Sequence, residues 1–184
     1  MEKQEFECLT LCPLDGRYSG VKDALGEYFS EYALVKYRVF VEIQWLKFLI
    51  ENVKSDVLAK FDSQNMDKLT SIASEFNYDS FARIKEIENT TRHDVKAVEY
   101  FIDEKVDALG FGYLQSFVHI GCTSEDINNT SYACMLKYGL KDVWLPKAKE
   151  FAAIINKWAE EHSEDAMLAH THGQPATPTT IGKE

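Results

Sequence analysis

The apolar residues of this chain recur mostly at intervals of three and four positions. The clearest stripes span Met66–Phe76, Phe81–Ile87, Val95–Val106 and Phe151–Trp158. Side chains at that spacing lie on one face of an α-helix, so each stripe predicts a helix. Local signals set the ends: Asp79 is a candidate N-cap, and the helix that starts near Asp94 is expected to stop at Gly110.

The segment from Val35 to Ile50 is ambiguous. Val39, Val41 and Ile43 alternate with their neighbours as in a strand, yet Val35, Val39, Ile43 and Leu46 also follow helical spacing. Roughly twenty residues without Gly or Pro is too long for a typical strand. Length therefore favours a helix.

Two further helices are expected from Thr123 to about Gly139 and after Pro146. No Asn-Gly or Asp-Gly pair separates alternating runs, so no hairpin is expected. Thr179–Glu184 is typical of the opening of another helix, with Thr as the cap. The predicted fold class is all-α.

Composition narrows the possible functions. The chain has 184 residues, with 20 basic and 30 acidic side chains, a net charge of −10 and 45% hydrophobic residues. The apolar content excludes a disordered chain, and the acidic excess argues against nucleic-acid binding through phosphates. No apolar run approaches the roughly 20 residues of a membrane span, and the N-terminus lacks the layout of a signal peptide. We therefore expect a cytoplasmic protein without a membrane partner, with its four cysteines reduced.

Three segments are candidate anion sites. Thr90–Lys96 and Gly121–Ser124 place basic or hydroxyl side chains at expected helix starts, where free N–H groups attract anions. Asp15–Tyr18 places an Arg and a Tyr after a tight turn. Each could instead be an ordinary cap or solvated surface. Together they predict a substrate with several negative groups.

His170 and His172 are the other candidates. They lie in a segment with Gly173 and two prolines, which excludes regular helix, and residues two apart in an extended run face the same way. An active-site role for one of them fits an imidazole that titrates near neutral pH. Metal binding lacks a confirming Asp, Glu or Cys, so no metal is expected.

Four segments together resemble a known family. Pro13–Tyr18, Thr90–Tyr100, Thr123–Asn129 and Thr171–Pro178 are similar, in order and spacing, to the adenylosuccinate lyases of the fumarase/aspartase superfamily. The resemblance implies an N-terminal helical domain over residues 1–111. It also implies that residues 112–184 form the truncated first part of a long central helical bundle.

The resemblance implies a carbon–nitrogen lyase that eliminates fumarate from adenylosuccinate, giving AMP, and from the succinylated carboxamide ribotide of purine synthesis, without a cofactor. His172 matches the general acid. The residues that match substrate-binding positions are Arg17 and Tyr18 for the phosphate end, Arg92, His93 and Asp94 as a triplet, and Thr123 and Ser124 for a carboxylate.

The chain also departs from the family pattern. The Ser-Ser-x-Met-Pro loop that carries the family's general base is absent from these residues. Family active sites combine three subunits of a homotetramer, so we expect this chain alone to be inactive. The alternative hypothesis is a non-catalytic helical module that binds a partner.

Overall fold

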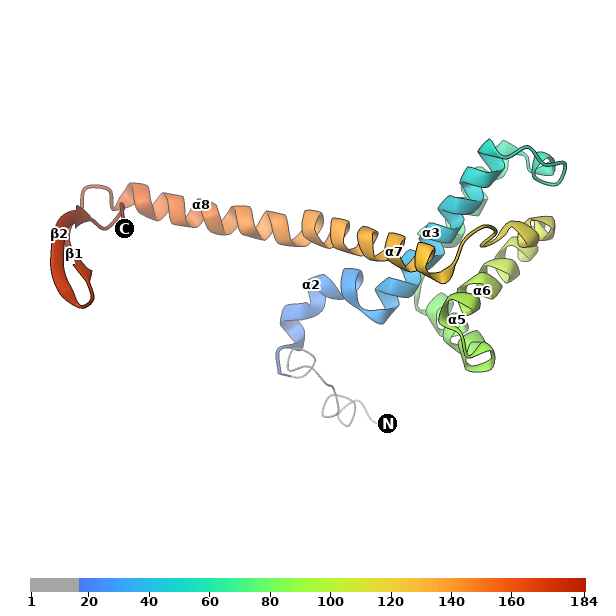
Figure 1. The fold of residues 1–184 in the computed structure, drawn as a ribbon, viewed down its shortest axis with the longest axis horizontal. Helices are drawn as coiled ribbons and strands as arrows, with labels where there is room; N and C mark the ends of the chain where they lie inside the picture. The colour runs from blue at the N-terminus through green and yellow to red at the C-terminus, as the bar shows by residue number, and fades with distance from the viewer. Residues whose placement is uncertain (1–16) are drawn as a thin grey trace. The chain divides into compact units, whose positions relative to one another are not determined.

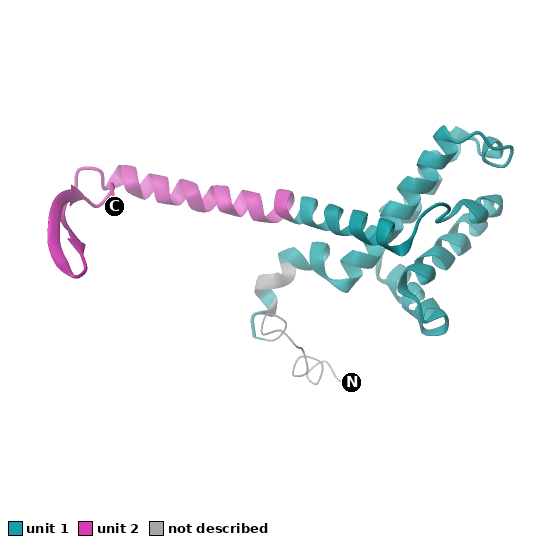
Figure 2. Cartoon of the chain, in the orientation of Figure 1, with its two compact units in different colours: residues 1–139 teal, residues 140–184 magenta. Residues whose placement is uncertain are grey.

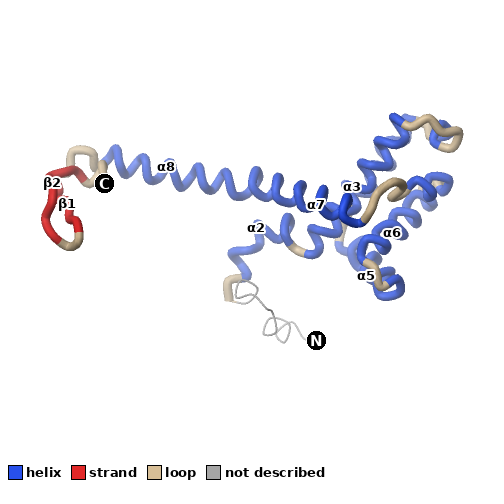
Figure 3. Tube along the Cα trace, viewed as in Figure 1, coloured by secondary structure: helices blue, strands red, loops and turns tan. Residues whose placement is uncertain are grey.

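The computed structural model describes residues 17–184, where seven α-helices precede one two-stranded hairpin (Figure 1). The α-helices are α2 (Ser19–Phe29), α3 (Glu31–Asn52), α4 (Met66–Ser74), α5 (Tyr78–Thr91), α6 (Asp94–Ala108), α7 (Ser124–Gly139) and α8 (Leu145–Glu161). Short 3₁₀ turns lie at η2 (Leu58–Lys60), η3 (Ser63–Asn65) and η4 (Gly112–Phe117), and a π-helical turn, η5 (Leu140–Trp144), precedes α8. The predicted all-α class is confirmed, with the hairpin as the one departure (Figure 3).

The chain divides into two compact units (Figure 2). The first runs to Gly139 and the second comprises Leu140–Glu184. The predicted domain boundary between residues 111 and 112 came from the family resemblance and stays a prediction.

Helix α3 is the centre of the first unit. It contacts α2, α4, α5, α6 and α7, so neighbours cover it on several sides. Val39, Val41 and Ile43 are all buried as a result. A helix covered all round needs apolar residues beyond a single stripe, which explains the strand-like alternation in the sequence. The prediction of a helix from its length is confirmed.

The core of the first unit joins α3 to the helices that follow it. The predicted stripe of α6 is buried throughout, from Val95 to Val106, and Phe101 meets the edge of Phe76 with 6.5 Å between ring centroids. Burying one such large apolar side chain contributes roughly 1.5–3 kcal/mol. This packing fixes the position of α6 and therefore of its first residues.

Of two predicted helix ends, one is wrong and one is confirmed. Asn77, not Asp79, caps α5: its Oδ1 accepts the Ser80 N–H at 3.0 Å, and Asp79 lies in the first turn. The predicted stop of α6 is confirmed, because Ala108 is its last residue and Gly110 adopts a left-handed φ of 82°.

Contrary to prediction, residues near the end of the chain form a β-hairpin. Strand β1 (Ala166–Thr171) pairs antiparallel with β2 (Gln174–Thr180), with a bulge after Leu168. His172 and Gly173 form the two-residue turn with φ values of 51° and 74°. Two positive φ angles suit a type I′ turn, in which Asn usually takes the place that His172 holds here.

The helix expected to open at Thr179 is absent. Thr179 and Thr180 end β2, and the chain then returns to the end of α8. There the Ile181 N–H donates to the Asp165 carbonyl and the Gly182 N–H to the His162 carbonyl, both at 2.9 Å. A Cβ on Gly182 would lie 2.1 Å from the backbone oxygen of Ala159, so only glycine fits this approach.

The second unit buries no large apolar side chain. Trp144, Phe151, Ile155 and Trp158 are all exposed and follow one another at intervals of seven, four and three residues. That spacing gathers them along one side of a helix. We call these four residues the apolar stripe of α8. Within residues 17–184, no helix has the length and apolar character that a membrane crossing needs.

Candidate functional site

His93 and Asp94 form the start of α6. His93 is the N-cap: its Nδ1 accepts the Lys96 N–H at 3.2 Å, which requires that nitrogen to carry no proton. The same nitrogen lies 3.6 Å from Asp94 Oδ1. The imidazole side chain is 53% exposed, so a ligand can reach it. Thr91 fixes the approach, since its Oγ1 accepts the His93 N–H at 3.3 Å.

Arg92 lies between α5 and α6 in an unusual conformation. It has a left-handed φ of 56°, it is exposed, and its N–H donates to the Glu88 carbonyl at 2.8 Å. A left-handed non-glycine residue ends α5 sharply and directs the chain into the α6 cap. The triplet Arg92, His93 and Asp94 is therefore a tight corner that presents a cation and an imidazole beside a helix start.

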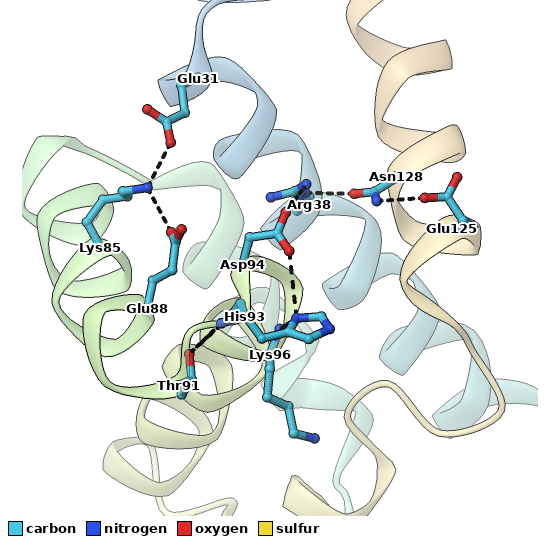
Figure 4. Close-up of polar contacts among 10 residues, drawn as sticks. All are labelled: Glu31, Arg38, Lys85, Glu88, Thr91, His93, Asp94, Lys96, Glu125 and Asn128. Atoms are coloured by element: carbon cyan, nitrogen blue, oxygen red, sulfur yellow. Dashed lines mark hydrogen bonds and ion pairs between the residues drawn. The ribbon is translucent and has the colours of Figure 1, made fainter.

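A buried arginine connects this corner to two other helices. Arg38 of α3 is only 5% exposed, and its NH2 atom lies 2.6 Å from Asp94 Oδ2. Its Nε donates to Asn128 Oδ1 of α7 at 2.9 Å, and the Asn128 amide donates to Glu125 at 3.2 Å (Figure 4). Arg38 therefore ties α6 and α7 to α3. Sequence reasoning missed it, although a lone Arg between Val35 and Val39 was the available signal.

The ion pair also changes the acidity of Asp94. Partial burial works to raise the pKa of this carboxyl, but the charge of Arg38 and the Val95 N–H outweigh it. The pKa of Asp94 is lowered as a result. Asp94 is thus held as a carboxylate whose charge is matched by Arg38, while Arg92 and His93 remain exposed beside it.

Thr123 and Ser124 form the start of α7. The Thr123 N–H and hydroxyl donate to Asp126 Oδ2 at 2.8 and 3.0 Å, and these hydrogen bonds lower the pKa of Asp126. Ser124, half-buried, is the first residue of the helix. An anionic ligand that takes the Thr123 hydroxyl would replace Asp126 as its acceptor.

The remaining predicted residues lie apart from this network. Arg17 and Tyr18 are exposed just before α2, with the guanidinium carbon 5.8 Å from the Tyr18 ring centroid. The predicted turn at Asp15 and Gly16 lies outside the described residues. His172 is exposed in the hairpin turn of the second unit. Of the predicted site residues, Asp94 alone bonds to Arg38 directly. Arg92 and His93 precede Asp94 in the chain, and Thr123 and Ser124 lie at the start of α7, the helix that carries Asn128.

A mainly apolar pocket of about 510 Å³ opens beside the start of α7. Its lining includes Phe48 of α3, together with Cys122, Asp126 and Cys134. None of the predicted site residues lines it. Burial raises the pKa of both cysteine thiols, which keeps them protonated and poorly nucleophilic. Across residues 17–184, no three His, Cys, Asp or Glu side chains gather closely enough to hold a metal ion.

Comparison with known proteins gives consistent matches. Residues 16–184 match a family model described as lyase. The chain is 47% identical over 182 residues to the adenylosuccinate lyase of Vibrio cholerae, which covers 98% of the chain and 40% of that relative. The adenylosuccinate lyases of Escherichia coli K12 and Dictyostelium discoideum are each 44% identical, over 98% and 95% of the chain and 40% and 38% of the relatives. The chain thus spans about 40% of the length of the relatives it matches.

The Arg38–Asp94 pair predicts a pH-dependent loss of stability. Asp94→Asn is expected to lower the free energy of unfolding near pH 7 by about 1 kcal/mol, a value reduced because Asp94 is half-exposed. A carboxyl whose pKa is depressed by folding stabilises above its ordinary pKa and loses that contribution as pH falls through the lowered value. The difference from wild type should therefore close in acid. Urea unfolding of wild type and variant at pH 7 and in acid measures this difference in the free energy of unfolding.

Asp56→Asn, in an exposed loop, is the matched control and should leave the unfolding free energy unchanged at either pH. A difference for Asp94→Asn that stays constant from neutral to acid pH would contradict the ionic interpretation of this contact.

Proposed function

The chain belongs to the lyase family whose model it matches over residues 16–184, and we propose that it forms part of an adenylosuccinate lyase. The proposed reaction is the elimination of fumarate from adenylosuccinate, which leaves AMP. We extend it to the succinylated carboxamide ribotide of purine synthesis. The observation that carries the proposal is the likeness of nearly the whole chain to relatives of that name.

The charges of the substrate suit the first unit. Adenylosuccinate carries a phosphate and two carboxylates. Helix N-termini attract such anions, and α6 and α7 each present one, where His93 and Asp126 now accept from N–H groups that an anion could take over. In the proposed role, Arg92 and His93 bind an anionic group directly. Asp94, the third member of the triplet, pairs with Arg38 and so holds this corner in place. Thr123 and Ser124 are assigned to a carboxylate, and Arg17 and Tyr18 to the phosphate end.

His172 is assigned the general acid. In this elimination a base removes a proton from the succinyl carbon, and an acid must protonate the departing nitrogen. An imidazole suits that step because it exchanges protons near neutral pH. Its exposed position in a tight turn supports the assignment, since a ligand can reach the imidazole. No metal or organic cofactor is needed for these two proton transfers.

The proposed enzyme is a homotetramer. The apolar stripe of α8 supports this, because large exposed apolar surface favours association with a partner. We propose a cytoplasmic enzyme that acts on a small nucleotide, without a nucleic-acid or membrane partner.

The central test is turnover. A polypeptide in which this chain is completed to the length of its relatives should release fumarate from adenylosuccinate, followed by ultraviolet absorbance. Residues 1–184 alone should show no turnover, because they lack the family's Ser-bearing loop. A correctly folded, completed polypeptide without turnover would favour the non-catalytic helical module instead.

His172→Ala in the completed polypeptide should lower kcat by a factor of about 100 or more, because general acid catalysis typically contributes 10²–10⁴-fold. Circular dichroism should remain unchanged, since His172 is exposed. The control is His162→Ala, which removes an exposed imidazole at the end of α8 and should retain full activity. Near-normal kcat for His172→Ala would remove the general-acid assignment.

The apolar stripe predicts self-association of the 184-residue chain. Sedimentation should give a mass well above the 21.1 kDa of one chain. The double substitution Phe151→Asp and Trp158→Asp should restore the monomer, because two charges would then interrupt the stripe. Lys149→Asp, on the opposite side of α8, is the control and should leave association intact. A monomeric wild-type chain would argue against a role of the stripe in assembly.

A further inference from the structure

Helix α3 carries three polar side chains on one face. Arg38, Glu42 and Trp45 follow one another at intervals of four and three residues, which aligns them along the helix. Arg38 is 5% and Glu42 only 1% exposed. Burying two ionisable groups in the central helix is costly unless each is paired, so their partners reveal what this face does. We call the three residues the polar face of α3.

The partners of the polar face all lie at the starts of α6 and α7 or in the loop between η4 and α7. Arg38 binds Asp94 and Asn128, as described above. Glu42 Oε1 lies 2.5 Å from His119 Nδ1, and Trp45 Nε1 donates to the Ile120 carbonyl at 2.9 Å. One helix face thus contacts both helix starts assigned to the substrate and the loop that leads into the second of them.

That loop, Val118–Thr123, has a backbone that needs external support. His119 has a left-handed φ of 60°, and Gly121 follows with 74°. A non-glycine residue in this region is strained and persists only where its surroundings hold it. Glu42 and Trp45 supply two fixed points, one at the His119 side chain and one at the adjacent Ile120 carbonyl.

The buried carboxyl of Glu42 has His119 as its one hydrogen-bonding side chain among the described residues. Burial raises the pKa of this carboxyl, and the hydrogen bond and charge of His119 oppose that rise. Its second oxygen has no hydrogen-bond partner among the described residues. The other imidazole nitrogen, Nε2, lies 3.8 Å from Glu99, which pairs with Lys96 at 2.6 Å. His119 is therefore oriented between an α3 carboxylate and the side of α6.

We propose that the polar face of α3 positions the two anion-binding helix starts relative to each other. The inference rests on the proposed function and extends it: Arg38, Glu42 and Trp45 are positioning residues that act through Asp94, His119 and Ile120. Two anionic groups of one substrate are recognised together only when the groups that bind them keep a fixed separation. A helix that holds the start of α6 and the loop before Thr123 supplies that separation.

The test uses three variants of the completed polypeptide. Trp45→Phe removes the indole N–H but keeps an aromatic ring against Phe48, whose centroid lies 5.5 Å away. Glu42→Ala removes the hydrogen-bond partner of His119 Nδ1, whereas Glu42→Gln keeps an amide that can bond to this nitrogen as donor or acceptor. Glu51→Gln, at an exposed position of the same helix, is the control.

Trp45→Phe and Glu42→Ala should each raise the KM for adenylosuccinate about tenfold and change kcat less than about threefold, because they weaken binding in ground and transition states alike. Glu42→Gln should return KM to within about threefold of wild type, and Glu51→Gln should match wild type. A merely stabilising role would lower the melting temperature of these variants without this KM change.

Hydrogen exchange gives a readout that does not depend on turnover. The amides of Val118–Ile127 should exchange faster in Trp45→Phe and Glu42→Ala, while those of α5 keep their wild-type rates. An inactive wild type would overturn the proposed function, and the exchange rates would still decide whether the polar face holds the loop. Unchanged exchange, or faster exchange with unchanged KM in an active enzyme, would overturn the inference. If Glu42→Gln failed to restore KM, the role proposed for the hydrogen bond between Glu42 and His119 would be overturned.

Discussion

The burial of α3 is the constraint on which the first unit depends. Neighbouring helices cover it on several sides, so its apolar residues form the core and two of its charged residues, Arg38 and Glu42, are buried with them. A buried guanidinium and a buried carboxylate must be paired inside the protein. Their partners, Asp94 and His119, are thereby drawn to α3 together with the segments that carry them. The core and the arrangement of the candidate site are consequences of the same burial.

The atoms proposed to bind anions at the two helix starts already have structural roles. His93 caps α6 through its ring nitrogen, and Thr123 binds Asp126 in the first turn of α7. A helix without such caps would leave its first N–H groups unsatisfied. An anion that bound at either start would therefore exchange one set of hydrogen bonds for another. Its affinity would then depend on differences between comparable contacts, and the proposed spacing of the two starts would matter more than any single hydrogen bond.

Local features of this molecule could be predicted from the sequence, and long-range ones could not. Helical spacing and Gly110 identified α6, and the expected helix starts directed attention to Thr90–Lys96 and Gly121–Ser124, because these signals act over three or four residues. The pairing of Arg38 with Asp94 and Asn128 joins residues 56 and 90 positions apart, which no local pattern encodes. The hairpin was missed for a different reason: His172 holds a place in its turn that Asn usually takes. Local chemistry had already singled out Arg17, Tyr18 and His172 as candidates, but their specific roles rested on the family resemblance.

The return of the chain at Gly182 changes how the hairpin behaves mechanically. Both of its strands are fixed at the end of α8, one by continuity and the other by the amides of Ile181 and Gly182. The seven residues of β2 then carry the turn about 20 Å from that anchor, at the usual rise of a strand. His172 therefore lies at the far end of a hairpin whose two strands are both held at the end of α8. A side chain at position 182 would clash with the Ala159 carbonyl and release β2 from the end of α8. A substitution far from His172 would therefore change the position of the imidazole without contacting it.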